Sequence, residues 1–126
     1  MAQADVRQYE VQACSTETFG RVLCSARNHH FVVDGPTQNG CPGEAITPAE
    51  LFLAGVAACG VELMQVIARE QKMPLQDASV GIYCVMDRNN PVRPDLALFN
   101  SVRLQFLLKG VTDGQAAQLI AAFKGR

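Results

Sequence analysis

The chain has 126 residues, enough for one domain with a substantial core, and we treat residues 1–126 as a single domain. Its 11 basic and 12 acidic residues form no basic block, so neither a nucleic acid nor an anionic membrane is an expected partner. No secretory signal is visible, and the longest apolar run, Leu51 to Ala58, is shorter than the about 20 residues that a membrane span needs. Five cysteines, an odd number without a CxxC pair, indicate free thiols in a reducing, cytoplasmic environment.

Three short β segments precede the most apolar part of the chain. They cover residues 6–13, 19–26 and 29–34, and their tight connections favour an antiparallel meander. A loop rich in glycine and proline follows at residues 34–46 and carries Cys41. Loops of about a dozen residues inside a compact domain are commonly functional or mobile.

A long helix is predicted from Pro48 to about Lys72, where a Met-Pro pair ends it. Thr47 is a favourable N-cap, and Glu50 three residues later completes a capping box. Pro48 falls at the first helical position, where its missing N–H costs nothing. Several independent signals therefore agree on where this helix begins.

The first half of this helix is apolar on every side between Leu51 and Glu62, which predicts a buried central helix. Gly55 and Gly60 flank Cys59 there, although glycine in a helix costs about 1 kcal/mol relative to alanine. Close approach of another backbone, such as a helix of a twofold-related subunit, would explain both glycines.

Two more strands and a second helix complete the predicted order. The strands cover residues 77–87 and 98–109, and Thr112 with Gln115 forms a second capping box. The apolar stripe of the last helix consists of Ala116, Leu119, Ile120 and Phe123. The order βββ-α-ββ-α is an α+β pattern.

Cys59 allows two interpretations. A cysteine in an apolar helix is most often a small packing residue. However, Gly55 and Gly60 open space near the sulfur, and Glu62 lies one turn later on the same face. Glu62 could orient the thiol or hold an arginine that stabilises the thiolate, or it could be a surface residue paired with a base.

The other polar and sulfur-containing residues give weaker indications of a functional site. Cys41 is either a resolving thiol or an incidental exposed cysteine, and Arg21 and Arg27 fit solvated positions of the first sheet. Adjacent residues of a strand point to opposite faces, so His29 and His30 cannot readily share a metal. Neither zinc-ligand spacing nor a glycine-rich phosphate loop is present, so no metal and no cofactor are expected. The cysteines read as packing residues are Cys14, Cys24 and Cys84.

The stretch Thr47-Pro-Ala-Glu-Leu-Phe-Leu-Ala-Gly-Val-Ala-Ala-Cys59 resembles the OsmC/Ohr family, named after osmotically inducible protein C and organic hydroperoxide resistance protein. The element order over residues 20–126 is similar too. The resemblance implies an OsmC-like fold in which two chains intertwine as a homodimer, with the active sites at the interface. It also implies a peroxidatic cysteine whose thiolate reduces an organic hydroperoxide and becomes a sulfenic acid. A second cysteine then forms a disulfide with it, which a dithiol reductant reopens.

Residue by residue, Cys59 matches the peroxidatic cysteine. The glutamate that follows the helix-start proline in the organic hydroperoxide group falls at Ala49, and Glu50 stands one position later, as in the broader OsmC-like branch. Arg21 is the nearest candidate for the activating arginine of the first sheet. The second cysteine would follow Arg126, so the chain either lacks its C-terminal segment or lacks the usual resolving thiol.

Two functions remain open from the sequence. One is a thiol-dependent peroxidase for small organic hydroperoxides in oxidative stress defence, with catalytic Cys59 and candidate partners Glu62, Glu50 and Arg21. The other is a non-catalytic OsmC-like dimer that has a structural role or binds a small apolar ligand.

Overall fold

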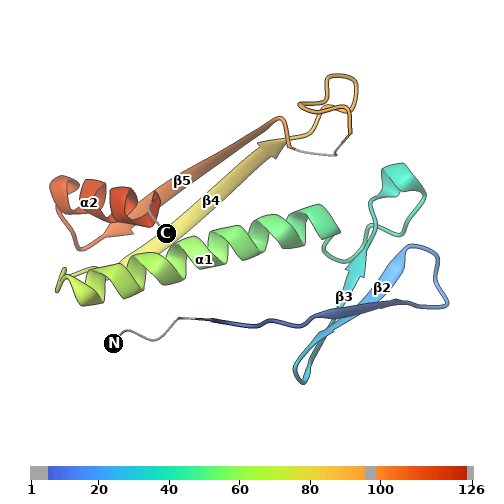
Figure 1. Ribbon diagram of the computed structural model, residues 1–126, viewed down its shortest axis with the longest axis horizontal. Helices are drawn as coiled ribbons and strands as arrows, with labels where there is room; N and C mark the ends of the chain where they lie inside the picture. The colour runs from blue at the N-terminus through green and yellow to red at the C-terminus, as the bar shows by residue number, and fades with distance from the viewer. Residues whose placement is uncertain (1–5, 96–98, 125–126) are drawn as a thin grey trace. The chain divides into compact units, whose positions relative to one another are not determined.

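The computed structural model describes residues 6–95 and 99–124 and has the predicted α+β element order, with one short 3-10 helix added (Figure 1). The chain divides into two compact units, Met1–Phe52 and Leu53–Arg126. In chain order the elements are β1 (Gln12–Ser15), β2 (Arg21–Ala26), β3 (His29–Asp34), η1 (Thr37–Asn39), α1 (Pro48–Glu70), β4 (Asp77–Val85), β5 (Ser101–Lys109) and α2 (Asp113–Lys124).

The first unit contains a three-stranded antiparallel sheet in the order β1-β2-β3. A two-residue turn joins β2 to β3, so Ala26 pairs with His29 and, at the far end, Arg21 pairs with Asp34. Arg27 in this turn has a φ of 55°, in the left-handed region. The predicted meander is therefore confirmed, and β3 has the predicted bounds.

The first strand differs from its prediction. Residues 6–13 were expected to be extended and paired, whereas β1 pairs with β2 only from Gln12 to Ser15. The register explains the difference: Gln12 lies opposite Ser25, and β2 ends one residue later at Ala26. In this register Val11 would face Ala26, the last residue of β2, and residues 6–10 would extend past the end of that strand.

Backbone hydrogen bonds hold the loop of residues 34–46 against this sheet. Gly35 N–H donates to the Gly20 carbonyl at 2.8 Å, and Asp34 N–H donates to the Ile46 carbonyl at 3.0 Å. Both ends of the loop are thus fixed to β2 and β3, and the loop has an ordered place in the first unit.

Both predicted capping boxes are present. In the first, Glu50 accepts from the Thr47 N–H at 3.0 Å and from its hydroxyl at 2.8 Å, while Glu50 N–H donates to Thr47 Oγ1 at 3.4 Å. In the second, Thr112 and Gln115 bond reciprocally at 3.0 and 3.1 Å. The helix α1 ends two residues before the predicted Lys72, which itself has a left-handed φ of 55°.

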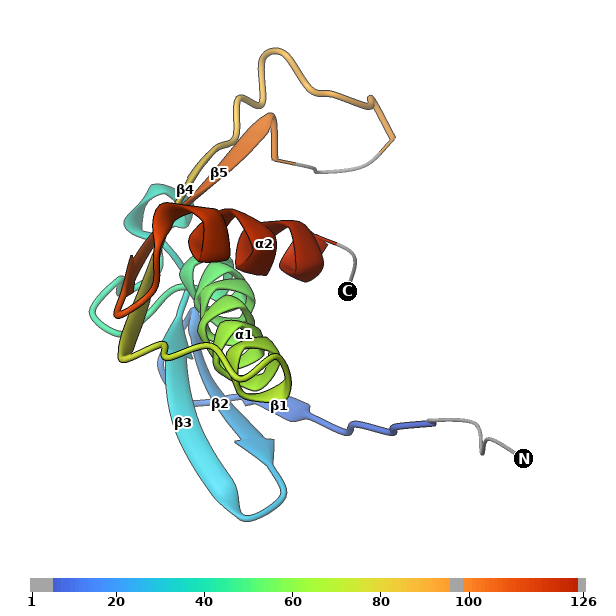
Figure 2. The ribbon, with the colours of Figure 1, turned by 90° about the vertical axis from the view of Figure 1, so that its left-hand side faces the viewer.

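The second unit has its core where the C-terminal half of α1 and α2 meet the antiparallel β4–β5 ribbon. Figure 2, which looks along α1, shows the two helices beside these strands. Fully or almost fully buried side chains in this core are Met64, Ile67, Ala68 and Leu119. Partly buried residues such as Ala78, Phe106 and Phe123 pack against them, in agreement with the predicted stripes.

The burial of α1 is less complete than its composition predicts. Its buried residues are Gly60, Met64, Ile67 and Ala68, all in the C-terminal half. A Cβ on Gly60 would meet side chains of Val80, Phe106 and Phe123 at 3.5–3.8 Å, whereas one on Gly55 would meet nothing within 4 Å. Within one chain, neither glycine is therefore explained by another backbone.

Judged by mean hydropathy and not by an uninterrupted apolar run, α1 meets a criterion for a membrane-spanning helix. Over an 18-residue window the mean hydropathy of α1 is 2.0, so its length and composition suffice to cross a membrane. The core helix of a soluble protein meets the same criterion, and polar Glu62 lies inside this helix. A single helix of this kind is weak evidence for a membrane span.

Candidate functional site

Cys59 lies in the middle of α1, and its residue is exposed in the single chain. The next residue, Gly60, is buried against the β4–β5 ribbon and α2. Because successive helix residues are about 100° apart, the Cys59 side chain leaves the helix on a different side from the core. Cys59 is therefore a free, exposed residue and not part of the core of its unit.

Glu62 and Cys59 are separated by one helical turn on α1, and Glu62 is exposed as well. Side chains three residues apart are neighbours on a helix surface. The structure thus places on one exposed face the two site residues that the sequence placed together.

Arg21 lies at the start of β2 and is bound to two carboxylates. Its Nε donates to Asp34 Oδ1 at 2.8 Å and its Nη2 to Asp34 Oδ2 at 2.9 Å, while Nη2 also donates to Glu44 Oε1 at 3.2 Å. These interactions raise the pKa of Arg21 above its ordinary value, principally through the hydrogen bond to Asp34.

Asp34 is completely buried at the end of β3. Besides Arg21, the backbone N–H groups of Glu44 and Ala45 donate to its Oδ2 at 3.0 and 2.9 Å. The hydrogen bonds from Arg21 are the largest cause of a pKa held well below the usual range, against the opposing effect of burial. Asp34 is therefore an ionised carboxylate that connects β2, β3 and the end of the loop.

Glu50 is engaged at the start of α1. Its carboxylate accepts both hydrogen bonds from Thr47, and these lower its pKa, the side-chain bond contributing most. Arg21 thus donates hydrogen bonds to Asp34 and Glu44, and Glu50 accepts from Thr47, while Cys59 and Glu62 share a helix face.

All five cysteines are free. Cys41 is half-buried, because its side chain lies against Gly20 and Gly35, where a Cβ at either position would overlap its sulfur. Cys24 is buried and Cys84 half-buried, as packing residues would be, whereas Cys14 is exposed on β1, contrary to expectation. Cys14 lies opposite Leu23, which is exposed as well, so the sheet face that carries both residues is uncovered at this point.

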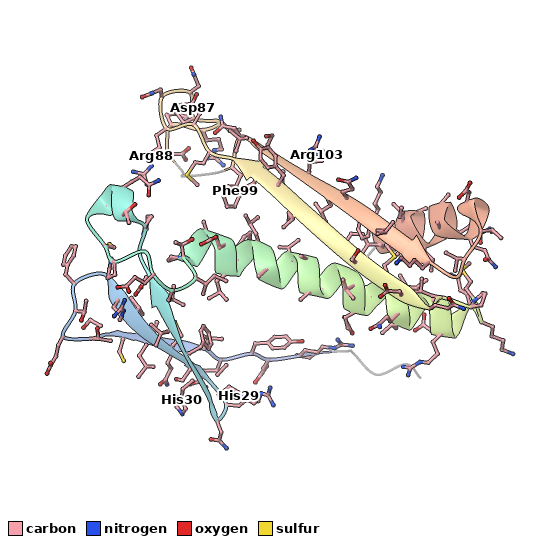
Figure 3. The ribbon with its side chains drawn as sticks, turned by 180° about the vertical axis from the view of Figure 1, so that it is seen from behind. His29, His30, Asp87, Arg88, Phe99 and Arg103 are labelled. Atoms are coloured by element: carbon pink, nitrogen blue, oxygen red, sulfur yellow. The ribbon has the colours of Figure 1, made fainter. Side chains whose placement is uncertain are left out.

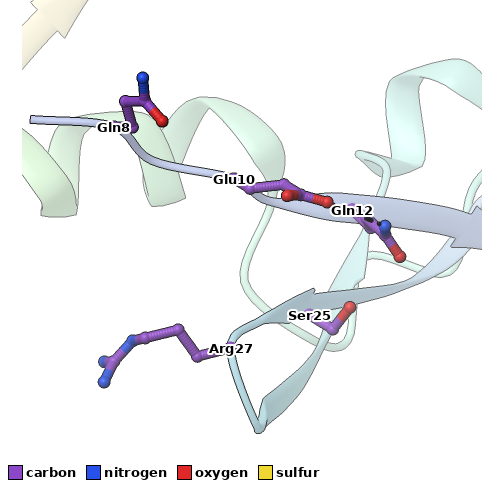
Figure 4. A pocket seen from close by; sticks show the side chains of 5 residues that line it. All are labelled: Gln8, Glu10, Gln12, Ser25 and Arg27. Carbon is purple, nitrogen blue, oxygen red and sulfur yellow. Dashed lines mark hydrogen bonds between the residues drawn. The ribbon is translucent and has the colours of Figure 1, made fainter.

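Two further polar regions of the first unit carry no thiol. Gln8, Glu10, Gln12, Ser25 and Arg27 line a shallow pocket of about 400 Å³ (Figure 4). His29 and His30 begin β3 beside the turn, and their side chains lie on different sides of the strand (Figure 3). Among the described residues, no group of three or more His, Cys, Asp or Glu side chains could hold a metal ion.

Asp34 and Glu44 were not predicted as partners of Arg21. A signal for Asp34 was available, since a two-residue turn at residues 27–28 fixes Arg21 opposite Asp34 across the two predicted strands. Glu44 comes from the loop, whose path follows from no such register.

Solved structures show the same fold. An OsmC-like protein from Mycoplasma pneumoniae superimposes with a TM-score of 0.81 at 14% identity, over 95% of this chain and 82% of that chain. An organic hydroperoxide resistance protein OsmC from Legionella pneumophila gives 0.68 at 24%, over 94% and 82%. One from Elizabethkingia anophelis gives 0.69 at 20%, over 94% and 82%.

No protein-family model matches this sequence, and no curated protein does. The similarity is therefore carried by the structure, and the chain has the fold of OsmC-like and organic hydroperoxide resistance proteins. This finding supports the resemblance that the helix motif suggested.

Proposed function

We propose that this protein is a thiol-dependent peroxidase that reduces organic hydroperoxides, with Cys59 as its catalytic residue. The observation that carries the proposal is the exposed thiol in the middle of α1. Its support is that proteins described as organic hydroperoxide resistance proteins share the fold. A cysteine that only packs in the core would be buried, whereas Cys59 is exposed.

The proposed reaction is a two-electron reduction of the peroxide. The Cys59 thiolate attacks the outer peroxide oxygen, so that an S–O bond forms and the O–O bond breaks. The alkoxide leaves and takes up a proton to become the alcohol, while Cys59 becomes a sulfenic acid. One thiol of a dithiol reductant then displaces water to give a mixed disulfide. Its second thiolate releases Cys59 and leaves the reductant as a disulfide.

Glu62 is the candidate positioning residue because it follows Cys59 by one turn on the exposed face. A carboxylate beside a thiolate opposes its ionisation, so Glu62 would act by orienting the thiol or by holding a cation there. Arg21 and Glu50 remain weaker candidates, because Asp34, Glu44 and Thr47 occupy their hydrogen-bonding groups.

The proposal extends to assembly and location. The exposed small residues of α1 around Cys59, which include Ala54, Gly55 and Ala58, would be covered in a homodimer. Five free cysteines suit a reducing cytoplasm, where dithiol reductants are available. Sedimentation velocity without detergent tests the dimer, and a monomer at micromolar concentration would contradict it.

The activity is tested with cumene hydroperoxide and dithiothreitol, following loss of peroxide. Cys59→Ser should remove turnover, whereas Cys14→Ser, which removes another exposed thiol, should retain it. Trapping with dimedone followed by peptide mass spectrometry should place the sulfenic acid on Cys59. Equal rates for wild type and Cys59→Ser would disprove the proposal.

A second candidate is a non-catalytic OsmC-like dimer with a structural or ligand-binding role. It is favoured by the hydrogen bonds that Arg21 makes with Asp34 and that Glu50 accepts from Thr47. In that case the alkylation rate of Cys59 by iodoacetamide should match that of exposed Cys14, and no sulfenic acid should be trapped. A Cys59 that is oxidised much faster than Cys14 would exclude this candidate.

A further inference from the structure

The shallow pocket of the first unit, with a volume of about 400 Å³, is lined by polar side chains from two directions (Figure 4). Gln8, Glu10 and Gln12 come from the segment that leads into β1 and from β1 itself, and Ser25 and Arg27 come from β2 and the turn after it. The lining thus holds one carboxylate, one guanidinium, two amides and a hydroxyl group, and its two charges balance. Such a lining favours a polar ligand without net charge.

The strand register sets the two charged residues opposite each other. Gln12 pairs with Ser25 in the antiparallel β1–β2 ladder. Two positions further along, just past the end of β2, Glu10 would face Arg27. In a regular ladder, opposite charges at facing positions stabilise each other directly.

Here the two charges do not form that pair. Arg27 has a left-handed φ of 55°, so the backbone turns away from the line of β2 at this position. Glu10 Oε1 accepts a hydrogen bond from Gln12 Nε2 at 3.3 Å, and its carboxylate lies toward Gln12 (Figure 4). Among the residues that the structure describes, neither Glu10 nor Arg27 forms an ion pair. The pocket therefore presents an acid and a base whose charges a ligand can bridge.

We propose that this pocket binds a small zwitterion of the amino-acid class, with its carboxylate at Arg27 and its ammonium group at Glu10. A guanidinium binds a carboxylate through two parallel hydrogen bonds, and an ammonium group donates up to three. A ligand with both charges compensates both side chains, whereas an ion of one sign compensates one of them. The lining contains no thiol, so the site does not depend on the peroxidase proposal.

Amide chemical shifts measured during a titration with L-serine test the proposal. Two analogues of L-serine keep one charge each, because 3-hydroxypropanoate lacks the ammonium group and ethanolamine lacks the carboxylate. Each should bind roughly fivefold more weakly than L-serine, the scale of one exposed charge pair. The shifts should centre on residues 8–12 and 25–27 and persist in Cys59→Ser.

Two substitutions separate the contributions of the two charges. Glu10→Gln should weaken L-serine and ethanolamine roughly fivefold and leave 3-hydroxypropanoate unchanged. Arg27→Gln should weaken L-serine and 3-hydroxypropanoate by a similar factor and leave ethanolamine unchanged. The matched controls are Glu17→Gln and Arg88→Gln, which remove exposed charges outside the pocket and should not change the affinity for L-serine.

Three results would overturn the proposal. Equal affinities for L-serine and its two analogues would show that the paired charges do not select the ligand. Shifts centred outside the pocket, or equal weakening by the control substitutions, would place the interaction elsewhere. The absence of any shift with L-serine would show that Glu10 and Arg27 are only solvated surface charges.

Discussion

Arg21 holds the fully buried carboxylate of Asp34 by two hydrogen bonds, 2.8 Å from Nε to Oδ1 and 2.9 Å from Nη2 to Oδ2. The two residues face each other across β2 and β3, and the backbone of Glu44 and Ala45 completes the coordination of the carboxylate. Paired hydrogen bonds of this kind fix orientation as well as charge. The interaction therefore sets where the loop returns to the sheet just before α1.

Replacing the buried acid should destabilise the protein. Asp34→Asn keeps the shape of the side chain but can no longer accept both hydrogen bonds from Arg21, which is left without its buried counter-charge. We expect a lower urea midpoint for this variant. Asp95→Asn is the control, because the Arg93–Asp95 pair is similar in geometry at 2.7 Å but exposed at 57% and 60%. Equal midpoints for the two variants would contradict the structural role of Asp34.

The same pair predicts an acid-labile contribution to stability. The pKa of Asp34 is lowered in the folded protein, so its stabilisation is complete above the unfolded value of about 3.9 and is lost as pH falls toward the folded value. Between pH 5 and pH 2 the urea midpoint of wild type should therefore fall more than that of Asp34→Asn. Glu50, whose pKa is also lowered, contributes equally to both proteins. If the urea midpoints of the two proteins fall in parallel with pH, Asp34 does not supply the acid-labile part of the stability.

The N-terminal cap of α1 should contribute measurably to the free energy of unfolding. Thr47→Ala removes the hydroxyl that exchanges hydrogen bonds with Glu50 and should cost about 1 kcal/mol in the free energy of unfolding. Thr112→Ala should have a similar effect at α2. Chemical denaturation measures both, and Thr18→Ala, at an exposed site outside any helix, should change little.

The turn between β2 and β3 contains a strained residue. Arg27 has a φ of 55°, a conformation that costs a residue with a Cβ roughly 1 kcal/mol and glycine almost nothing. Arg27→Gly should therefore raise the thermal midpoint. At the neighbouring Asn28, which is not in the left-handed region, glycine should give no gain. A lower midpoint for Arg27→Gly than for Asn28→Gly would show that the Arg27 side chain outweighs its backbone strain.

Gly60, which lies beside Phe106 and Phe123, should tolerate one methyl group but not a larger side chain. A Cβ at Gly60 would lie at ordinary contact distances of 3.5–3.8 Å, so Gly60→Ala should stabilise α1 by up to about 1 kcal/mol. Gly60→Leu would overlap Val80, Phe106 and Phe123 and should cost about 1–3 kcal/mol. Urea denaturation of both variants checks the prediction, and destabilisation by alanine would mean that something else approaches Gly60.

Most of the fold could be predicted from local signals. The tight turn between the second and third predicted strands and the two capping boxes each act over a few residues, and the structure has each of them where it was predicted. The extent of β1 could not be predicted in this way, because it depends on where β2 stops. The sequence shows that residues 6–11 can be extended but does not show that the strand pairing begins only at Gln12.

The candidate site was less predictable for a related reason. Periodicity places Cys59 and Glu62 on one face of α1, but burial depends on what packs there, and within one chain that face is exposed. The partners of Arg21 depend on the path of a loop without periodic structure. Contacts between residues that are distant in the sequence therefore determine the burial of Cys59 and the partners of Arg21, and local sequence patterns do not predict such contacts.

The close approach of Cys41 to the sheet couples positions that are distant in the sequence. A Cβ on Gly35 would lie 2.5 Å from the Cys41 sulfur and 2.9 Å from its Cβ. A larger residue at position 35 is therefore tolerated only if position 41 becomes smaller, and the effects of the two substitutions are not additive. We therefore expect Gly35→Ala to be tolerated better in combination with Cys41→Ala than alone.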